Sequence, residues 1–161
     1  MIRRCMALAC AVLALTACAR LLPATQQRSS QGPTAEEIWY VSVAMQNGRE
    51  PNYDEKQHWR DQLDIRISAY LRQHPEDANS LQLSTFRFDY RVAAGMSKEM
   101  VLILFGPPIS TTTSEADMER VARRYWPMLK GNVTEAWEYP LGWTLYFAGL
   151  RLTELTQYLP R

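Results

Sequence analysis

The apolar residues of the chain follow two different periods along the sequence. Between residues 34 and 73 they recur every three or four positions, which predicts amphipathic helices. From residue 135 to residue 158 they tend to alternate with polar residues, which predicts strands. We therefore expect helices in the first part of the chain and strand hairpins in the last third.

Capping residues set the bounds of two helices near the N-terminus. Thr34 and Glu37 have the spacing of a capping box and open a predicted helix over residues 34–47. A second apolar stripe over residues 54–73 stops before Pro75, which cannot continue a helix. These two helices form a predicted N-terminal helical extension, residues 34–77.

Two further helices are predicted in the middle of the chain. Ser97 is a natural N-cap before a short apolar helix that ends at Gly106, and Ser114 opens another helix that should end before Pro127. The segment 81–95 fits a helix and a strand equally well, because its aromatic residues satisfy both periods. We favour a helix there.

Three strands in sequence complete the prediction. Residues 135–139, 143–147 and 150–158 are separated by two turn signals, so they should form an antiparallel meander. A short β-branched stretch at residues 109–113 is a further candidate strand. The expected fold class is α+β: a two-layer domain at residues 78–161, with helices packed on a three-stranded antiparallel sheet, preceded by the N-terminal helices.

The first 33 residues carry an export signal rather than a folded segment. Two arginines precede an apolar run of about a dozen residues, which is shorter than the roughly 20 needed to cross a bilayer. The run ends in Leu15-Thr16-Ala17-Cys18, which resembles the lipobox of bacterial lipoproteins. The resemblance implies that residues 1–17 are removed, that Cys18 is the lipid-attachment residue carrying acyl chains such as palmitate, and that Ala19 directs the protein to the outer membrane. The polar residues 18–33 are predicted to be a flexible tether.

The charge of the exported chain excludes one class of partner. Removal of residues 1–17 takes two arginines from 18 basic residues and none from 17 acidic ones, which leaves 16 against 17. A balanced chain lacks the basic surface that binds nucleic acid, so we expect no nucleic-acid partner. Two of the three cysteines leave with the signal, and no thiol other than Cys18 remains.

No residue pattern in the chain predicts catalysis, a metal site or a cofactor. Ser97 opens a helix, and the residue two positions after it is not the glycine that a nucleophile elbow requires. We therefore interpret Ser97 as a helix cap. His58 and His74 lie about four turns apart on one predicted helix, too far to share a metal ion. We therefore expect a protein that is not an enzyme.

Aromatic residues crowd the predicted sheet and are the candidate partner-binding residues. If helices cover only one sheet face, the other face exposes amphipathic aromatic side chains, which are common in protein interfaces. Equally, the N-terminal helices could cover that face with Trp39 and Trp59. The candidate residues are Trp137, Tyr139, Trp143, Tyr146 and Phe147.

The second half of the chain also carries four motifs in a defined order. Together with the lipobox, they resemble the SmpA/OmlA (BamE-like) family of small outer-membrane lipoproteins, although the N-terminal helices and an insertion at residues 114–133 depart from that family. The resemblance implies two helices against three strands and a role with the β-barrel assembly machine. The motifs are GMSKEMV at residues 95–101, LFGPP at 104–108, WEY at 137–139, and LYF at 145–147 with GLRL at 149–152.

These expectations combine into one functional hypothesis. The protein is expected to be lipid-anchored in the outer membrane, facing the periplasm, and to bind another envelope protein in outer-membrane assembly or envelope integrity. The alternative is an inhibitor or sensor that docks on an enzyme through its aromatic sheet face. An envelope hydrolase is the least favoured possibility.

Overall fold

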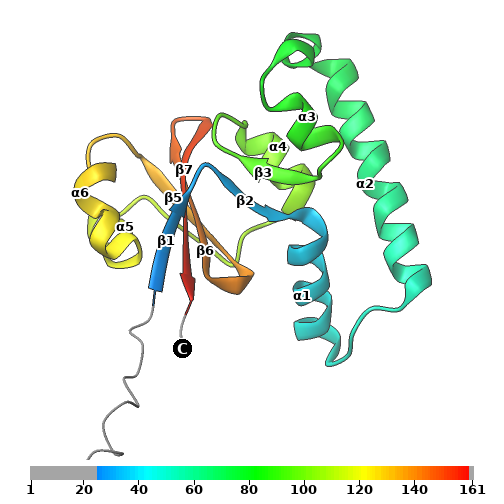
Figure 1. Cartoon of the computed structure of the whole chain (residues 1–161), viewed down its shortest axis with the longest axis horizontal. Coiled ribbons are helices and arrows are strands. Elements are labelled where there is room, and N and C mark those ends of the chain that lie inside the picture. The colour runs from blue at the N-terminus through cyan, green and yellow to red at the C-terminus, as the bar shows by residue number, and fades with distance from the viewer. Residues whose placement is uncertain (1–24, 160–161) are drawn as a thin grey trace, which may run out of the picture.

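A five-stranded antiparallel sheet lies at the centre of the fold. The computed structural model describes residues 25–159 (Figure 1). The strand order is β1-β7-β6-β5-β4, so the last three strands form the predicted meander and two earlier strands are added at its edges. The strands are β1 (Thr25–Ser29), β4 (Ser110–Thr112), β5 (Glu135–Tyr139), β6 (Trp143–Ala148) and β7 (Arg151–Leu159).

The α+β class is confirmed, but the prediction of three strands and of a tether through residue 33 is wrong. Strand β1 pairs antiparallel with β7, and Thr25 lies opposite Leu159. β7 has nine residues, so its free edge offers unpaired backbone groups to which the polar segment 25–29 can bond. The backbone, rather than an apolar pattern, therefore orders this segment.

A second, two-stranded sheet joins the N-terminal segment to the middle of the chain. It consists of β2 (Gln31–Thr34) and β3 (Arg91–Ala93). Within residues 81–95 only α3 (Leu83–Arg87) is helical and residues 91–93 form β3, so the prediction of a helix that ends at residue 95 is wrong outside α3. The change occurs at Tyr90, whose φ of 48° cannot continue a helix.

The predicted caps Thr34 and Ser97 begin two helices as expected, and Asn52, a cap that was not predicted, begins a third. Thr34 and Glu37 form the capping box of α1 (Ala35–Asn47), and Asn52 opens α2 (Tyr53–Gln73) with a second capping box. The 3₁₀ turn η1 (Pro75–Asn79) follows α2. Ser97 opens α4 (Lys98–Phe105), since its Oγ accepts the Met100 N–H at 3.1 Å.

The insertion at residues 114–133 folds as a separate helical layer. Ser114 caps α5 (Glu115–Ala122), as predicted. α5 ends before Pro127, as predicted, and the chain continues through the 3₁₀ turn η2 (Arg123–Tyr125) into a separate short helix, α6 (Trp126–Leu129). Pro127 lies in the first turn of α6, where its missing N–H costs no hydrogen bond.

The sheet is covered on both faces, so the prediction of two layers is wrong. Helices α1–α4 lie on one side of the sheet and α5 and α6 on the other (Figure 1). Trp39 stacks on Trp59 with ring centroids 4.7 Å apart, and Trp59 packs on the α1–α4 side. The N-terminal helices therefore join the first face, and the insertion covers the second.

The described helices include none that could cross a membrane. Over residues 25–159, none combines the length and the apolar character that a span requires.

Candidate functional site

The five aromatic residues predicted to bind a partner are mostly core residues. Tyr146 and Phe147 are fully buried, Trp137 and Tyr139 are buried, and only Trp143 is partly exposed. Burial raises the pKa of Tyr139 and is the main cause that raises the pKa of Tyr146 to about 12, so both phenols stay neutral. A partner cannot reach these side chains while the helices cover the sheet, and the prediction of an exposed aromatic face is wrong.

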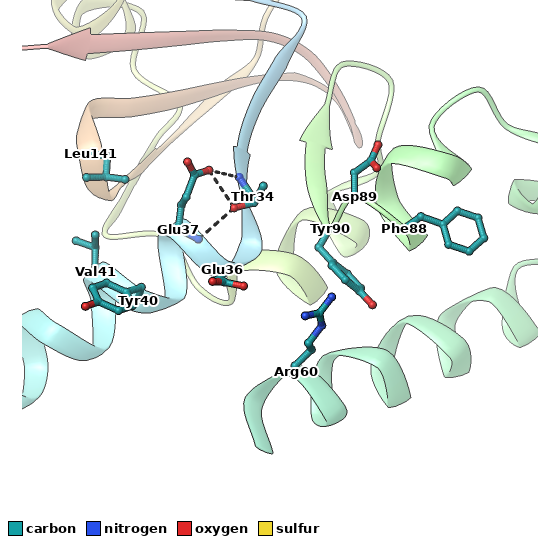
Figure 2. A pocket seen from close by; sticks show the side chains of 10 residues that line it. All are labelled: Thr34, Glu36, Glu37, Tyr40, Val41, Arg60, Phe88, Asp89, Tyr90 and Leu141. Carbon is teal, nitrogen blue, oxygen red and sulfur yellow. Dashed lines mark hydrogen bonds between the residues drawn. The ribbon is translucent and has the colours of Figure 1, made fainter. Parts of the chain in front are cut away.

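An open groove of about 510 Å³ offers a different site, shown in Figure 2. Three separate parts of the chain form its walls: the first turns of α1, one residue of α2, and the connection from α3 to β3, with the β5–β6 turn at its margin. Its lining residues are Thr34, Glu36, Glu37, Tyr40, Val41, Arg60, Phe88, Asp89, Tyr90 and Leu141.

Tyr90 stands in the groove with a strained backbone. Its φ of 48° lies in the left-handed region, which is rare for an aromatic residue. The Ala35 N–H donates to the Tyr90 carbonyl at 2.6 Å, and the Tyr90 hydroxyl donates to Asp64 Oδ1 at 2.6 Å. The hydrogen bond to Asp64 is the main cause that raises the pKa of Tyr90. α1 and α2 thus hold the residue on two sides.

Arg60 covers the ring of Tyr90. It reaches from α2 toward the ring in Figure 2, and its guanidinium carbon lies 5.5 Å from the ring centroid. An arginine over a tyrosine face is attracted by the negative face of the ring. The pair gives one wall of the groove both a cation and an aromatic surface.

Leu141 is the second strained residue of the groove. Its φ is 62° and that of Gly142 is 74°, so the two occupy the central positions of a type I′ turn between β5 and β6. Asparagine or glycine is the usual residue at the first of these positions, and a leucine there costs about 1–2 kcal/mol. The leucine side chain is nevertheless 45% exposed, so packing in the core does not explain its presence.

The groove carries more acidic than basic groups. Glu37 accepts the Thr34 N–H at 2.7 Å and is engaged as a cap, and Glu36 pairs with Lys56 at 2.5 Å. Asp89 makes no ion pair among residues 25–159. Three carboxylates thus line the groove against the single cation of Arg60.

Ser97 and the two histidines lie outside the groove. Ser97 Oγ lies 3.2 Å from the Tyr70 hydroxyl and caps α4, so it acts as predicted. His58 is exposed near the start of α2, and His74 lies at the C-terminal end of that helix, so they do not meet. Cys18, the predicted lipid-attachment residue, lies outside the described residues.

His74 belongs to a small polar cluster with Glu76 and Asp77, whose potential metal-ligating atoms lie within 4.8 Å of one another. Asp77 is already engaged, because it accepts the Tyr70 hydroxyl at 2.5 Å and faces Arg151 at 3.9 Å. These partners account for the buried carboxylate without a metal ion.

Comparison with known proteins adds no relative to this description. No family model, curated protein or solved structure matches the chain.

Proposed function

We propose that the protein is a non-enzymatic, lipid-anchored module of the outer membrane that faces the periplasm and binds another envelope protein through the groove. The lipobox ending in Cys18 supports the anchor and the location. The observation that carries the binding role is that Tyr90 and Leu141, two of the three non-glycine residues with positive φ among residues 25–159, line the same groove.

Strain in two separate segments supports this assignment. Left-handed backbone in a bulky residue costs free energy and is found where the surrounding structure holds it for a purpose. The α3–β3 connection and the β5–β6 turn are separated by about fifty residues, yet both present a strained side chain to the groove. Fold stability alone would favour glycine or asparagine at these positions.

The chemistry of the groove defines the partner segment. Tyr40, Val41 and Leu141 offer an apolar wall, whereas Asp89, which forms no ion pair among residues 25–159, offers negative charge. The best complement is a protein segment with one apolar anchor side chain beside a lysine or arginine. We propose this in place of the aromatic sheet face, and the resemblance to the SmpA/OmlA family makes a component of the β-barrel assembly machine the first candidate partner.

Site-specific crosslinking in living cells tests the proposal. A photoreactive amino acid at Val41 should link the protein to an envelope protein, and the linked segment should hold an apolar residue next to a basic one. The same amino acid at Arg66, which is exposed on α2 away from the groove, is the matched control and should give no such product. Crosslinking from Arg66 but not Val41 would overturn the proposal.

A variant separates binding from folding. Leu141→Asn removes the apolar side chain but suits the left-handed backbone, so the fold should be kept. Burying a leucine contributes about 1.5–3 kcal/mol, so the crosslink from Val41 should fall about tenfold or more. An unchanged yield would contradict a role for Leu141 in partner binding.

A further inference from the structure

The start of β1 limits how far the folded part can lie from the membrane. This inference rests on the proposed lipid anchor. Cys18 precedes Thr25 by seven residues, and seven residues span at most about 25 Å. A tether reaching to residue 34 would have allowed about 55 Å. Because β1 is part of the sheet, the end of the molecule at which it starts must remain close to the bilayer.

The same end carries two arginines. Thr25 pairs with Leu159, and Gln26 pairs with Tyr158 in the next register position. The guanidinium carbon of Arg123 lies 3.8 Å from the centroid of the Tyr158 ring, and Arg124 donates to the Gln26 carbonyl. Both arginines are therefore held beside the strand ends that the anchor brings to the membrane.

These arginines are available for an external anion. Both are exposed, and neither forms an ion pair among residues 25–159. The neighbouring Arg120 differs, since it pairs with Asp117 at 3.3 Å. Arginine binds phosphate through two parallel hydrogen bonds, so phospholipid headgroups suit these side chains.

We propose that the end of the sheet formed by Thr25, Tyr158 and Leu159, with Arg123 and Arg124 beside it, lies against the membrane surface and binds anionic phospholipid headgroups. The two guanidinium groups contact lipid phosphates. Tyr158 has the amphipathic character that favours the membrane–water interface, and the partly exposed Leu159 adds an apolar side chain there. The anchor and this surface together fix the orientation of the domain.

The orientation can be measured with single labels, because the exported chain has no cysteine besides Cys18. The acylated full-length protein is placed in vesicles of phosphatidylcholine and phosphatidylserine that contain a lipid quencher. A fluorophore at Leu159→Cys should be quenched strongly. One at Leu81→Cys should not, since Leu81 is 94% exposed in the connection from α2 to α3, at the opposite end from the start of β1 (Figure 1). Equal quenching, or stronger quenching at Leu81, would overturn the proposal.

The charge contribution is tested on the chain without acyl groups. Each arginine near an anionic surface contributes about fivefold to partitioning, so Arg123→Gln with Arg124→Gln should weaken binding to phosphatidylserine vesicles about 25-fold. The matched control pair, Arg66→Gln with Arg72→Gln on α2, should change binding by less than about twofold. Equal loss in both pairs, or no loss in either, would contradict the assignment, and thermal unfolding of each variant separates a folding defect from lost lipid contact.

The outcomes distinguish this inference from the proposed function. Mass spectrometry of the exported protein tests acylation of Cys18, on which both depend. If acylation is present and the labels at positions 159 and 81 are quenched equally, the orientation is wrong while the groove proposal stands. If the orientation is found but Val41 gives no crosslink, the groove proposal is wrong and the lipid surface stands.

Discussion

The two faces of the sheet are covered in different ways. On the α1–α4 side, eighteen buried residues within the described range 25–159 form one continuous core with aromatic pairs such as Trp137 and Phe147, whose ring centroids are 4.5 Å apart. On the α5–α6 side, only seven buried residues of the described part of the chain form the cluster, and it also encloses polar groups. The Gln26 side chain donates to the Val121 carbonyl at 2.8 Å, and the Tyr146 hydroxyl lies 3.3 Å from Thr156 Oγ1.

This difference indicates that the two helical layers contribute unequally to the stability of the fold. Apolar burial is the main source of stability, so the α1–α4 side contributes most of the free energy of unfolding. The α5–α6 side keeps the Trp126 Nε1–H and Gln26 Oε1 without a hydrogen-bond partner among residues 25–159, which lowers its contribution. The α5–α6 side instead excludes water from the second face of the sheet and carries Arg123 and Arg124.

The largest expected effect is loss of a core aromatic residue on the α1–α4 side. Phe147→Ala should lower the free energy of unfolding by about 3–5 kcal/mol, because Phe147 is fully buried against Trp137. Urea denaturation measures the change. Phe88→Ala, at a side chain that is 67% exposed, is the control and should stay within about 0.5 kcal/mol. A loss under 1 kcal/mol for Phe147→Ala would mean that the face is not packed as described.

A matched pair of leucines compares the two layers directly. Leu145→Ala, in the centre of the larger core, should cost about 4–5 kcal/mol, whereas Leu129→Ala on α6 should cost about 2–3 kcal/mol. Both leucines are almost fully buried, so the difference reflects how far the surroundings can collapse into the cavity. If urea denaturation gave equal losses, the two layers would be equally important to stability.

The strained turn at the groove should respond in the opposite direction. Leu141→Asn creates the Asn-Gly pair that a type I′ turn prefers, so it should raise the free energy of unfolding by about 0.5–1 kcal/mol. Its counterpart on the α5–α6 side is Arg123→Gly, at a φ of 52°, where the lost contact with Tyr158 should leave a smaller gain. Destabilisation by Leu141→Asn would show that the leucine serves the fold rather than the groove.

The smallest expected effect concerns pH. Burial opposes the charge of Glu135, but contacts with Lys98 and the Trp137 N–H outweigh it and hold its pKa below 4.5. A carboxylate whose pKa is lowered by folding stabilises the protein above its unfolded pKa, and this contribution is lost as the pH falls through 4.5 toward the folded pKa. Glu135→Gln should therefore flatten the loss of stability below pH 4.5, by under about 1 kcal/mol. An equally steep loss in the variant, measured by urea denaturation across that range, would assign the acid sensitivity to other groups.

The sequence predicted the elements whose signals are local. The capping residues Thr34, Ser97 and Ser114 begin helices as expected, and the meander of the last three strands forms in the expected order. In each case the residues that fix the structure lie within a few positions of one another. Short-range capping hydrogen bonds and the alternation of apolar and polar residues can be predicted from a single sequence.

The sheet edges and the covered second face could not be predicted in the same way. The segment TQQRS of β1 has no apolar alternation, and its partner β7 lies about 130 residues away. The stripe of Met118, Ala122 and Trp126 indicates an apolar helical surface but does not say which face of the sheet it covers. The predicted aromatic site failed for this reason, since whether Tyr146 is exposed depends on a layer placed by tertiary packing.

The groove had only a partial sequence signal. The sequence Pro140-Leu141-Gly142 predicts a turn, and a leucine before the glycine of a hairpin is unusual enough to indicate strain. Nothing near Tyr90 indicates positive φ, because contacts with Ala35 and Asp64 hold it there. Long-range contacts of this kind appear only in the folded structure.

Cysteine accessibility in cells whose outer membrane has been made permeable tests most directly whether a partner occupies the groove. Val41→Cys should react with a membrane-impermeant maleimide more slowly in cells with a permeable outer membrane than in the purified protein, because the partner covers it. Gln62→Cys, exposed on α2 outside the groove, should react equally fast in both. Equal reactivity of Val41→Cys in cells and in the purified protein would contradict the account.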